Sequence, residues 1–481
     1  MHAAFNVLDA PWIPVVSKDG TTKLLGVREV LQQAAELKEI SAPPLEEYCL
    51  YRFLGVFLMD ALRPQRIGEI QRLYKNGAFD MNPIEEYISQ CESEGVSFDL
   101  FDQKRPFLQS PYNEETDKVK PISSINFIKP SGNNHIHFDH DYENVYAVSA
   151  AKAARLLLSL QQFCTAGAQD YPSGVNGAPP YFGVVKGNNL FETLVFTLVP
   201  LQSIDNFDNP PVIWRTSEPV GCKKLVGETS WLRGMYFPAR RVLLVPPDKT
   251  GLVSQVYLSQ GENFKNPSSW FDPYVTYRSI ESGMAPLRPK IERPIWRNLC
   301  DIVDIKNNHA SLLLAQHINH FAESPYVRVT LYGISTNKAK YLDLVHHDLT
   351  LRKDLAQSEQ AIDFIRQAIS VTEQLAKSLK RCLCPSKVKL LSGEAANAAI
   401  TEFYDNVERR FWQICDMPSL EGSISEEHST WIHFVSESAI NAFDNALTKA
   451  NLRGKTLAVA AQQRFYLNRE TKMIKEAFQS E

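Results

Sequence analysis

Residues 396–414 read Ala-Asn-Ala-Ala-Ile-Thr-Glu-Phe-Tyr-Asp-Asn-Val-Glu-Arg-Arg-Phe-Trp-Gln-Ile, with an apolar side chain at every third or fourth position. This spacing matches the period of an α-helix and predicts a helix with one narrow apolar stripe. Three further stretches after residue 350 share this period, and short connections between them predict antiparallel neighbours. The sequence therefore predicts a C-terminal four-helix bundle over residues 356–481. Its four stripes comprise Ile362, Ile365, Ile369, Ala376 and Leu379; Ala396, Ile400, Phe403, Val407, Phe411 and Ile414; Trp431, Phe434, Ala439, Ala442 and Ala446; and Leu457, Ala461, Phe465, Ile474 and Phe478.

Two local signals predict helix ends within this bundle. Ser423 and Glu426 have the spacing of a capping box, which predicts that the third helix starts there. Gly454 predicts a stop before the fourth helix, because glycine readily adopts the left-handed conformation found at helix ends. The Phe and Met side chains of the bundle are expected to form its core rather than to hold a cofactor.

The chain before residue 350 has a mixed pattern. Strand-like runs occur at Phe5–Val16, Leu190–Pro200, Arg241–Val245 and Tyr326–Tyr332, separated by helical stretches and by connections rich in Pro and Gly. The predicted fold class is therefore α+β, with an irregular mixed α/β domain over residues 1–355 followed by the bundle.

The longest apolar run, Tyr48–Leu62, contains Arg52 and Asp60. It is too short to span a bilayer, so it predicts a buried helix rather than a membrane anchor.

Composition limits the classes of function. The 481 residues are 44% hydrophobic and 22% charged, as in an ordinary soluble globular protein, and the net charge is −4. No bulk positive field draws such a chain onto nucleic acid, so any contact of that kind must be local or must involve partner subunits. Eight cysteines in a chain of this length form no disulfide framework, and the N-terminus lacks the features of a secretory signal. A cytoplasmic location without membrane contact is therefore expected.

Residues 131–141, Ser-Gly-Asn-Asn-His-Ile-His-Phe-Asp-His-Asp, support two incompatible interpretations. Crowded imidazole and carboxylate groups suit a metal such as zinc and favour a metal-dependent hydrolase. The alternative is a recognition loop, bent by its Gly and Asn residues, that contacts a partner. A dinuclear site of this type needs a further histidine some tens of residues downstream, whereas the next histidine is His309. The recognition loop is therefore favoured over a metal site built from His135, His137, Asp139 and His140.

Common catalytic motifs are missing from the sequence. It has no G-x-x-x-x-G-K-[ST] phosphate loop, no G-x-G-x-x-G after a strand and no G-x-S-x-G elbow. This pattern favours a binding protein that is not an enzyme and carries no cofactor.

Several blocks together resemble the large subunit of the type I-E CRISPR surveillance complex, Cascade. Their order and spacing match that family from end to end. The blocks are Phe5-Asn-Val-Leu-Asp-Ala-Pro-Trp-Ile-Pro-Val15; Phe98-Asp-Leu-Phe101 with Arg105-Pro-Phe-Leu-Gln109; Ser131-Gly-Asn-Asn134 with Phe138-Asp-His140; Trp231 with Arg240-Arg241; and Tyr332-Gly333 ahead of Asn337-Lys-Ala-Lys340.

The resemblance implies a non-catalytic subunit that reads the protospacer-adjacent motif in double-stranded DNA. Such a subunit promotes strand opening and helps recruit a separate helicase-nuclease. Its implied partners are the target duplex, the CRISPR RNA held by the complex, and the backbone, guide 5′-end and small subunits of Cascade. Guide pairing reads the long target, so the protein need read only a short duplex motif from the degenerate minor groove.

The resemblance also implies a set of DNA-binding residues. The family's glycine-rich loop, which brings bare backbone against the minor groove, corresponds to the stretch with Gly167 and Ala168. The family's strand-separating wedge corresponds to Asn337, Lys338 and Ala339, with Lys338 in place of the usual Gln. The lysine finger corresponds to Lys265.

The loop at 131–141 has an implied role as well. Asn133, Asn134, Phe138 and His140 take positions associated with contacts to the guide or to the motif-proximal DNA. We further expect Arg240-Arg241 and Lys223-Lys224 to be exposed and to add non-specific attraction to phosphates. A helical scaffold without a DNA role is the remaining alternative, and it predicts that Lys338→Ala and Gly167→Asp leave duplex binding by the assembled complex unchanged.

Overall fold

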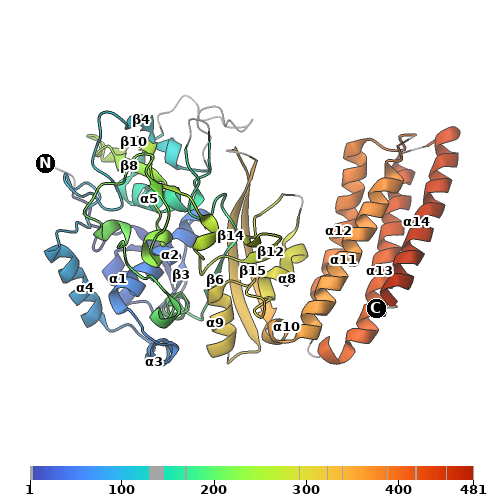
Figure 1. Cartoon of the computed structure of the whole chain (residues 1–481), viewed down its shortest axis with the longest axis horizontal. Helices are drawn as coiled ribbons and strands as arrows, with labels where there is room; N and C mark the ends of the chain where they lie inside the picture. The colour runs from blue at the N-terminus through green and yellow to red at the C-terminus, as the bar shows by residue number, and fades with distance from the viewer. Residues whose placement is uncertain are drawn as a thin grey trace. The chain divides into compact units, whose positions relative to one another are not determined.

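The chain divides into two compact units in the computed structural model (Figure 1). One unit contains residues 1–293 and 306–350, and the other contains residues 294–305 and 351–481. The structure describes residues 4–128, 146–167, 171–291, 293–321, 323–337, 340–386, 388–417, 420–450 and 452–479.

A buried helix, α2 (Pro44–Leu62), forms the centre of the first unit. Its apolar side chains cover every face, which is the pattern of a helix enclosed by other elements. The helices α4 (Met81–Ser93) and α5 (Ala150–Phe163) pack against it. The predicted buried helix within residues 48–62 is therefore confirmed. Other helices of this unit are α1 (Val27–Gln32), α3 (Ile67–Asn76), α6 (Leu190–Val195), α7 (Trp231–Met235) and α9 (Leu312–His320).

Small sheets, antiparallel except for the parallel pair of β7 and β11, complete the first unit. Three sheets of three strands have the orders β2-β1-β3, β4-β10-β8 and β15-β14-β6. In the last of these, β14 and β15 form one long hairpin whose β14 strand pairs with β6, from Arg328 opposite Lys186 to Tyr332 opposite Phe182. The strands are β1 (Ile13–Ser17), β2 (Thr22–Leu25), β3 (Leu37–Ile40), β4 (Lys118–Pro121), β5 (Val148–Ser149), β6 (Phe182–Lys186), β7 (Leu225–Val226), β8 (Arg240–Leu244), β9 (Leu252–Val253), β10 (Gln255–Gln260), β11 (Asn263–Phe264), β12 (Tyr277–Ile280), β13 (Gly283–Pro286), β14 (Tyr326–Asn337) and β15 (Lys340–Arg352).

The strand-like interpretation of residues 190–200 is wrong, because Leu190–Val195 form α6. The side chain of Asn189 caps this helix by accepting from the amide of Glu192 at 2.9 Å. The Glu192 carboxylate accepts in turn from the amide of Asn188 at 2.7 Å. A short apolar run does not by itself distinguish a strand from a buried helix, and the two hydrogen bonds at its start favour the helix.

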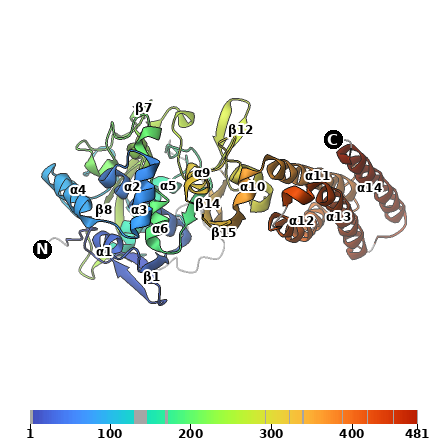
Figure 2. The same cartoon turned by 90° about the horizontal axis from the view of Figure 1, so that it is seen from below.

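Four long helices run side by side in the second unit (Figures 1 and 2). The stripes predicted on the first three helices are mostly buried, and Trp431 also donates from Nε1 to the carbonyl of Ala368 at 3.1 Å. The predicted fold class, an irregular α+β unit followed by a four-helix bundle, is confirmed. The helices of the second unit are α8 (Leu299–Val303), α10 (Lys353–Gln357), α11 (Glu359–Leu383), α12 (Gly393–Cys415), α13 (Leu420–Lys449) and α14 (Lys455–Gln479).

The stripe predicted on the fourth helix is wrong in its first half, because Leu457, Ala461 and Phe465 are exposed. Leu457 and Phe465 are 59% and 64% exposed, whereas Ala460 and Leu467 are buried. The ion pair of Arg464 with Asp444 at 2.7 Å joins α14 to α13. A period of three to four residues is compatible with more than one face of a helix, so the pattern alone could not choose the buried one.

The second unit also includes residues 294–305, which the sequence places with the first domain. Trp296 is fully buried there, with its ring centroid 4.9 Å from that of Phe411. Arg297 lies over the ring of Tyr404 at 4.2 Å and pairs with Glu373 at 3.2 Å. These contacts join sequence segments about a hundred residues apart, which no local pattern records.

The capping box predicted at Ser423 and Glu426 is also wrong, because α13 already begins at Leu420. Both residues therefore lie inside the helix. Among the helices of the described residues, none combines the length and the apolar character that crossing a bilayer requires.

Candidate nucleic-acid interface

The hairpin of β14 and β15 carries the predicted wedge at its tip. Asn337 is the last residue of β14 and is exposed, while Lys338 and Ala339 lie outside the described residues. Gly333 lies four residues before Asn337, and a Cβ atom built there would be 2.8 Å from Cγ of Pro289. A side chain at position 333 would therefore displace the segment that packs on this strand.

The β14 strand of the hairpin is joined to the buried helix α2 by Glu47. Tyr332 OH donates to Glu47 Oε1 at 2.7 Å, and Lys186 Nζ of the neighbouring strand lies 2.9 Å from the same oxygen. Burial by itself lowers the pKa of Lys186, but Tyr51 and Glu47 raise it above its ordinary value. The lysine is therefore charged, and the hairpin is anchored to the core of the first unit.

Tyr341 joins the β15 strand of the hairpin to the end of α5 and to the segment that contains Phe127. Its OH donates to the carbonyl of Phe163, the last residue of α5, at 3.0 Å. Its ring centroid lies 4.9 Å from that of Phe127. Burial raises the pKa of Tyr341, so its hydroxyl remains a donor at neutral pH. Tyr341 is the second residue of β15, so this strand begins beside the end of α5.

The predicted glycine loop begins directly after α5. The amide of Gly167 donates to the carbonyl of Tyr171 at 3.3 Å, which closes a small loop. Ala168, between them, lies outside the described residues. The Arg240 guanidinium holds both ends of this loop, since it donates to the carbonyls of Thr165 at 2.7 Å and Pro172 at 2.5 Å. It also lies over the ring of Tyr171, at 4.7 Å from the centroid.

The predicted phosphate attraction by Arg240-Arg241 is wrong, because both side chains are buried, with 7% and 4% exposure. Arg241 pairs with Asp117 and donates to backbone carbonyls. Burial alone raises the pKa of Asp117, but hydrogen bonds from Arg241 and Ser259 hold it below its ordinary value. The two arginines therefore position loops, and they do so because buried guanidinium groups need several acceptors at once.

Replacing Arg240 with Met should loosen the glycine loop without unfolding the first unit. A hydrogen bond from a charged donor contributes about 1.5–3 kcal/mol, so the amide of Gly167 should exchange with solvent at least about tenfold faster. Hydrogen exchange followed by mass spectrometry measures this change. Lys224→Met, at an exposed position, serves as the control. Equal exchange in Arg240→Met and the unaltered protein would show that the guanidinium does not hold the loop.

The two ends of the segment predicted as a recognition loop lie close to each other. Asn126 Nδ2 donates to Tyr146 OH at 2.8 Å, so the two flanks of residues 129–145 lie together. Asn133, Asn134, Phe138 and His140 lie outside the described residues, as do His135, His137 and Asp139 of the metal alternative. Elsewhere, over the ranges that the structure describes, no three His, Cys, Asp or Glu side chains are arranged to hold a metal.

Lys265 follows the two-residue strand β11 and is exposed. Its amide donates to the carbonyl of Val226 at 2.9 Å, so the short parallel ladder with β7 fixes its backbone. The preceding Gly261 approaches Pro238 so closely that a Cβ atom at 261 would lie 2.1 Å from the Pro238 carbonyl oxygen. The Lys265 segment is thereby attached next to Arg240, which holds the glycine loop.

The structure thus brings together three of the predicted segments. The flank of the 131–141 loop at Phe127, the foot of the glycine loop at Phe163 and the wedge hairpin meet at Tyr341. Sequence reasoning missed Tyr341 and the clamping role of Arg240. The available signal for Tyr341 was an aromatic side chain directly after the block that ends at Lys340.

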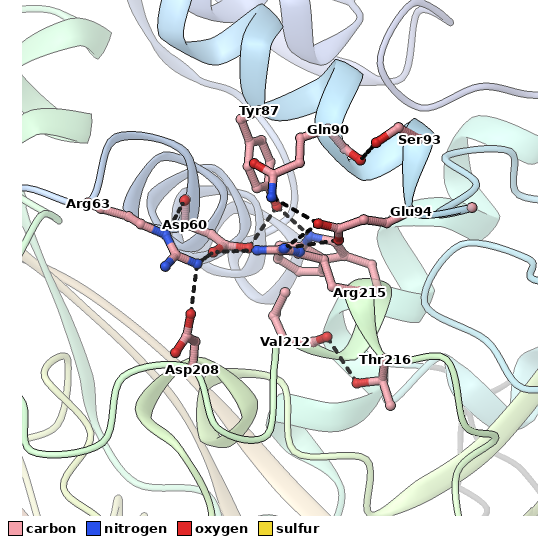
Figure 3. Close-up of polar contacts among 12 residues, drawn as sticks. Asp60, Arg63, Tyr87, Gln90, Ser93, Glu94, Asp208, Val212, Arg215 and Thr216 are labelled. Carbon is pink, nitrogen blue, oxygen red and sulfur yellow. Dashed lines mark hydrogen bonds and ion pairs between the residues drawn. The ribbon is translucent and has the colours of Figure 1, made fainter.

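A second charged cluster surrounds the buried carboxylate of Asp60 (Figure 3). Arg63 Nη2 lies 2.7 Å from Asp60 Oδ1, and Tyr87 OH donates to Asp60 Oδ2 at 2.9 Å. Arg215 pairs with Asp60 at 3.4 Å and with Glu94 at 2.9 Å. The opposite charges neutralise one another and join α2, α4 and the loop that carries Arg215. We therefore interpret this cluster as structural.

Comparisons with known proteins give one consistent result. The family described as CRISPR-associated protein Cse1 matches residues 6–452 of this chain. The CRISPR-associated protein CasA/Cse1 of Thermus thermophilus is 29% identical over 459 residues, which are 88% of each chain. A crystal structure of CasA from Thermus thermophilus has a TM-score of 0.78 at 23% identity and covers 98% of this chain and 100% of its own. A chain of a CRISPR RNA-guided surveillance complex has a TM-score of 0.79 at 19% identity, covering 96% of this chain and 99% of that one.

Proposed function

This chain belongs to the family of CRISPR-associated protein Cse1, and we propose that it is the large, non-catalytic subunit of a CRISPR RNA-guided surveillance complex. In that role it reads the protospacer-adjacent motif in double-stranded DNA and promotes opening of the first base pairs. It then helps to recruit the helicase-nuclease that cleaves the target.

The meeting of three segments at Tyr341 is the observation that carries this proposal. Minor-groove reading needs a backbone without bulky side chains, and the loop at Gly167 offers one. Strand opening needs a narrow element that can enter the duplex next to the motif, and the two-stranded hairpin of β14 and β15 offers one. Because the groove pattern is degenerate, such a site accepts several related motifs.

The anchoring of these segments supports the same function. Glu47 joins the hairpin to the core, and Arg240 holds both ends of the glycine loop. A wedge must resist the load of unstacking bases, which takes a few kcal/mol per step. Tyr341 of the hairpin contacts Phe163, which precedes the glycine loop. The hairpin and the loop are therefore fixed to each other and can act on the same site of the duplex.

The partners of the protein follow from its proposed role. The guide RNA and the backbone, guide 5′-end and small subunits hold the target strand, while this chain contacts the duplex beside it. With a net charge of −4, the isolated chain should bind DNA weakly, so the assembled complex is the relevant species.

Titration of the assembled complex against target duplexes that differ only in the flanking trinucleotide tests the proposal. Each unfavourable base pair should weaken binding by about 1–3 kcal/mol, or roughly 5-fold to 150-fold. Duplexes in which the first base pairs beside an intact, paired trinucleotide are already unpaired control for strand opening, because they should bind with less dependence on the hairpin tip. Equal affinity for all flanking trinucleotides would exclude motif reading by this complex.

A further inference from the structure

Two charged side chains, Arg278 and Arg288, have no role in the proposed function. Arg278 lies on β12 opposite Ala285, and Arg288 follows β13 by two residues. Both side chains are exposed, and Figure 2 shows the strand β12 standing out from the body of the first unit. Within the described part of the chain, neither guanidinium forms an ion pair or a hydrogen bond.

The two arginines lie on, or just after, the strands of one β-hairpin. The surrounding protein atoms, and then the charge of Arg278, lower the pKa of Arg288. An arginine stays charged at neutral pH despite such a shift, because its ordinary pKa is above 12. The hairpin therefore carries two like charges that have no ion-pair partner among the described residues, and an anion bound near both would lower their mutual repulsion.

One side of this arginine pair adjoins the glycine loop. A Cβ atom built on Gly177 would lie 3.0 Å from Arg288 Nη2, and the φ of +74° at Gly177 suits only glycine. Gly177 belongs to the turn that follows the loop at Gly167, since its amide donates to the carbonyl of Gly174 at 3.0 Å. Asn176 fixes this turn by donating to the buried carboxylate of Asp272 at 2.9 Å.

The other side adjoins the wedge hairpin. Tyr181 donates its amide to the carbonyl of Leu287 at 2.9 Å, and Pro289 packs where Gly333 of β14 has no side chain. The segment 287–289 therefore lies between the turn at Gly177 and the hairpin strand that leads to the tip. Arg288 is held between the two elements that are proposed to meet the duplex.

We propose that Arg278 and Arg288 together bind a backbone phosphate of the target duplex beside the motif. This inference rests on the proposed function and adds a phosphodiester site to it. A guanidinium binds phosphate through paired N–H donors, and two of them can bind adjacent oxygens of one phosphate or two successive phosphates. A phosphate held here would keep the duplex in register while the glycine loop and the hairpin tip act on the bases.

The test compares the complex containing Arg278→Ala/Arg288→Ala with the unaltered complex, over a series of salt concentrations. Loss of one phosphate contact should reduce the slope of log affinity against log salt by about 1. Affinity should fall by the same factor for every flanking trinucleotide, because phosphates carry no sequence information. Arg278→Lys/Arg288→Lys should retain most of the slope, since the charges remain.

Arg66→Ala/Arg72→Ala is the matched control. It removes two exposed arginines, one at the start of α3 and one within it. This helix contacts Phe321, which precedes the first strand of the hairpin and is remote in sequence from its tip. The control should leave the slope unchanged although it alters the net charge equally. Thermal unfolding of each variant checks that the fold is retained, because a purely structural role of Arg288 at Gly177 would lower the melting temperature and leave the slope unchanged.

The outcomes separate this inference from the proposed function. If the unaltered complex distinguishes trinucleotides but the double alanine variant binds duplex with the same slope, the phosphate site is excluded and motif reading stands. If the variant instead loses guide RNA during assembly while duplex binding by the intact complex is unchanged, the phosphate bound here belongs to the RNA. That result would overturn the assignment to the target duplex.

Discussion

Asp272→Ala should destabilise the first unit by about 3–5 kcal/mol, because it leaves a buried guanidinium without its counter-ion. Arg52 of α2 and Asp272 both have 0% side-chain exposure, with Arg52 Nη1 2.9 Å from Asp272 Oδ1. Burial by itself lowers the pKa of Arg52, but Asp272 raises it well above its ordinary value. The guanidinium therefore stays charged in the core and has no route to neutrality when Asp272 is removed.

The loss should spread beyond the ion pair. Asp272 also accepts from Asn176, so the variant frees the turn next to Gly177. Hydrogen exchange at the amides of α2, followed by mass spectrometry during denaturant titration, measures the stability of the first unit alone. Asp205→Ala, which removes an exposed carboxylate, should change this stability by less than about 0.5 kcal/mol.

A double variant distinguishes the buried charge from simple loss of packing. Arg52→Met with Asp272→Leu replaces both ions by apolar groups and should recover much of the stability lost in Asp272→Ala, since such replacements are often near neutral. If Asp272→Ala costs less than about 1 kcal/mol, or if the double variant is less stable than the single one, the account of an unpaired buried arginine is wrong.

Gly167→Asp should reduce duplex binding by the assembled complex by about 100-fold, the second large effect that we expect. The amide of Gly167 donates to the Tyr171 carbonyl, and Arg240 donates to the carbonyl of Thr165 at the start of the loop. Because these hydrogen bonds fix the loop backbone, it cannot move away to make room for a side chain. A carboxylate there would also face the phosphates that line the groove. Equilibrium binding to one matched duplex measures the change.

Two controls accompany this variant. Gly68→Asp adds the same charge on α3, where a new side chain meets nothing within 4 Å, and should leave binding unchanged. Gly167→Ala adds one methyl group without charge and should fall between the two. Unchanged binding by Gly167→Asp would favour the alternative of a helical scaffold without a DNA role.

Much of the architecture could be predicted from the sequence. The buried helix within residues 48–62 follows from a long apolar run, and three of the four bundle stripes follow from helical periodicity. The exposed face of α14 could not be predicted in this way, since Leu457 and Phe465 have the right spacing but lie on the wrong side. The place of Trp296 in the second unit depends on Phe411, which is 115 residues away (411 − 296).

The segments proposed to form the candidate site could be named from the sequence, but their arrangement in space could not. The resemblance to a known family implied the stretches at Gly167, Asn337 and Lys265. Neither the meeting at Tyr341 nor the burial of Arg240 could be inferred, because each depends on carbonyl groups from distant segments. Two adjacent arginines in a sequence suggest an exposed face of the protein. Here the side chains of Arg240 and Arg241 are instead buried and hold loops.

By itself, the sequence determined the long helices and which family the chain resembles, since helix periods and ordered motifs are local properties. Only the tertiary structure decided which charges are free to meet a ligand. Arg240 is occupied because two loop carbonyls converge on it, whereas neither Arg278 nor Arg288 forms an ion pair or a hydrogen bond within the residues that the structure describes. Whether a charged group is neutralised depends on what folding brings within a few ångströms of it, and that information is absent from local spacing.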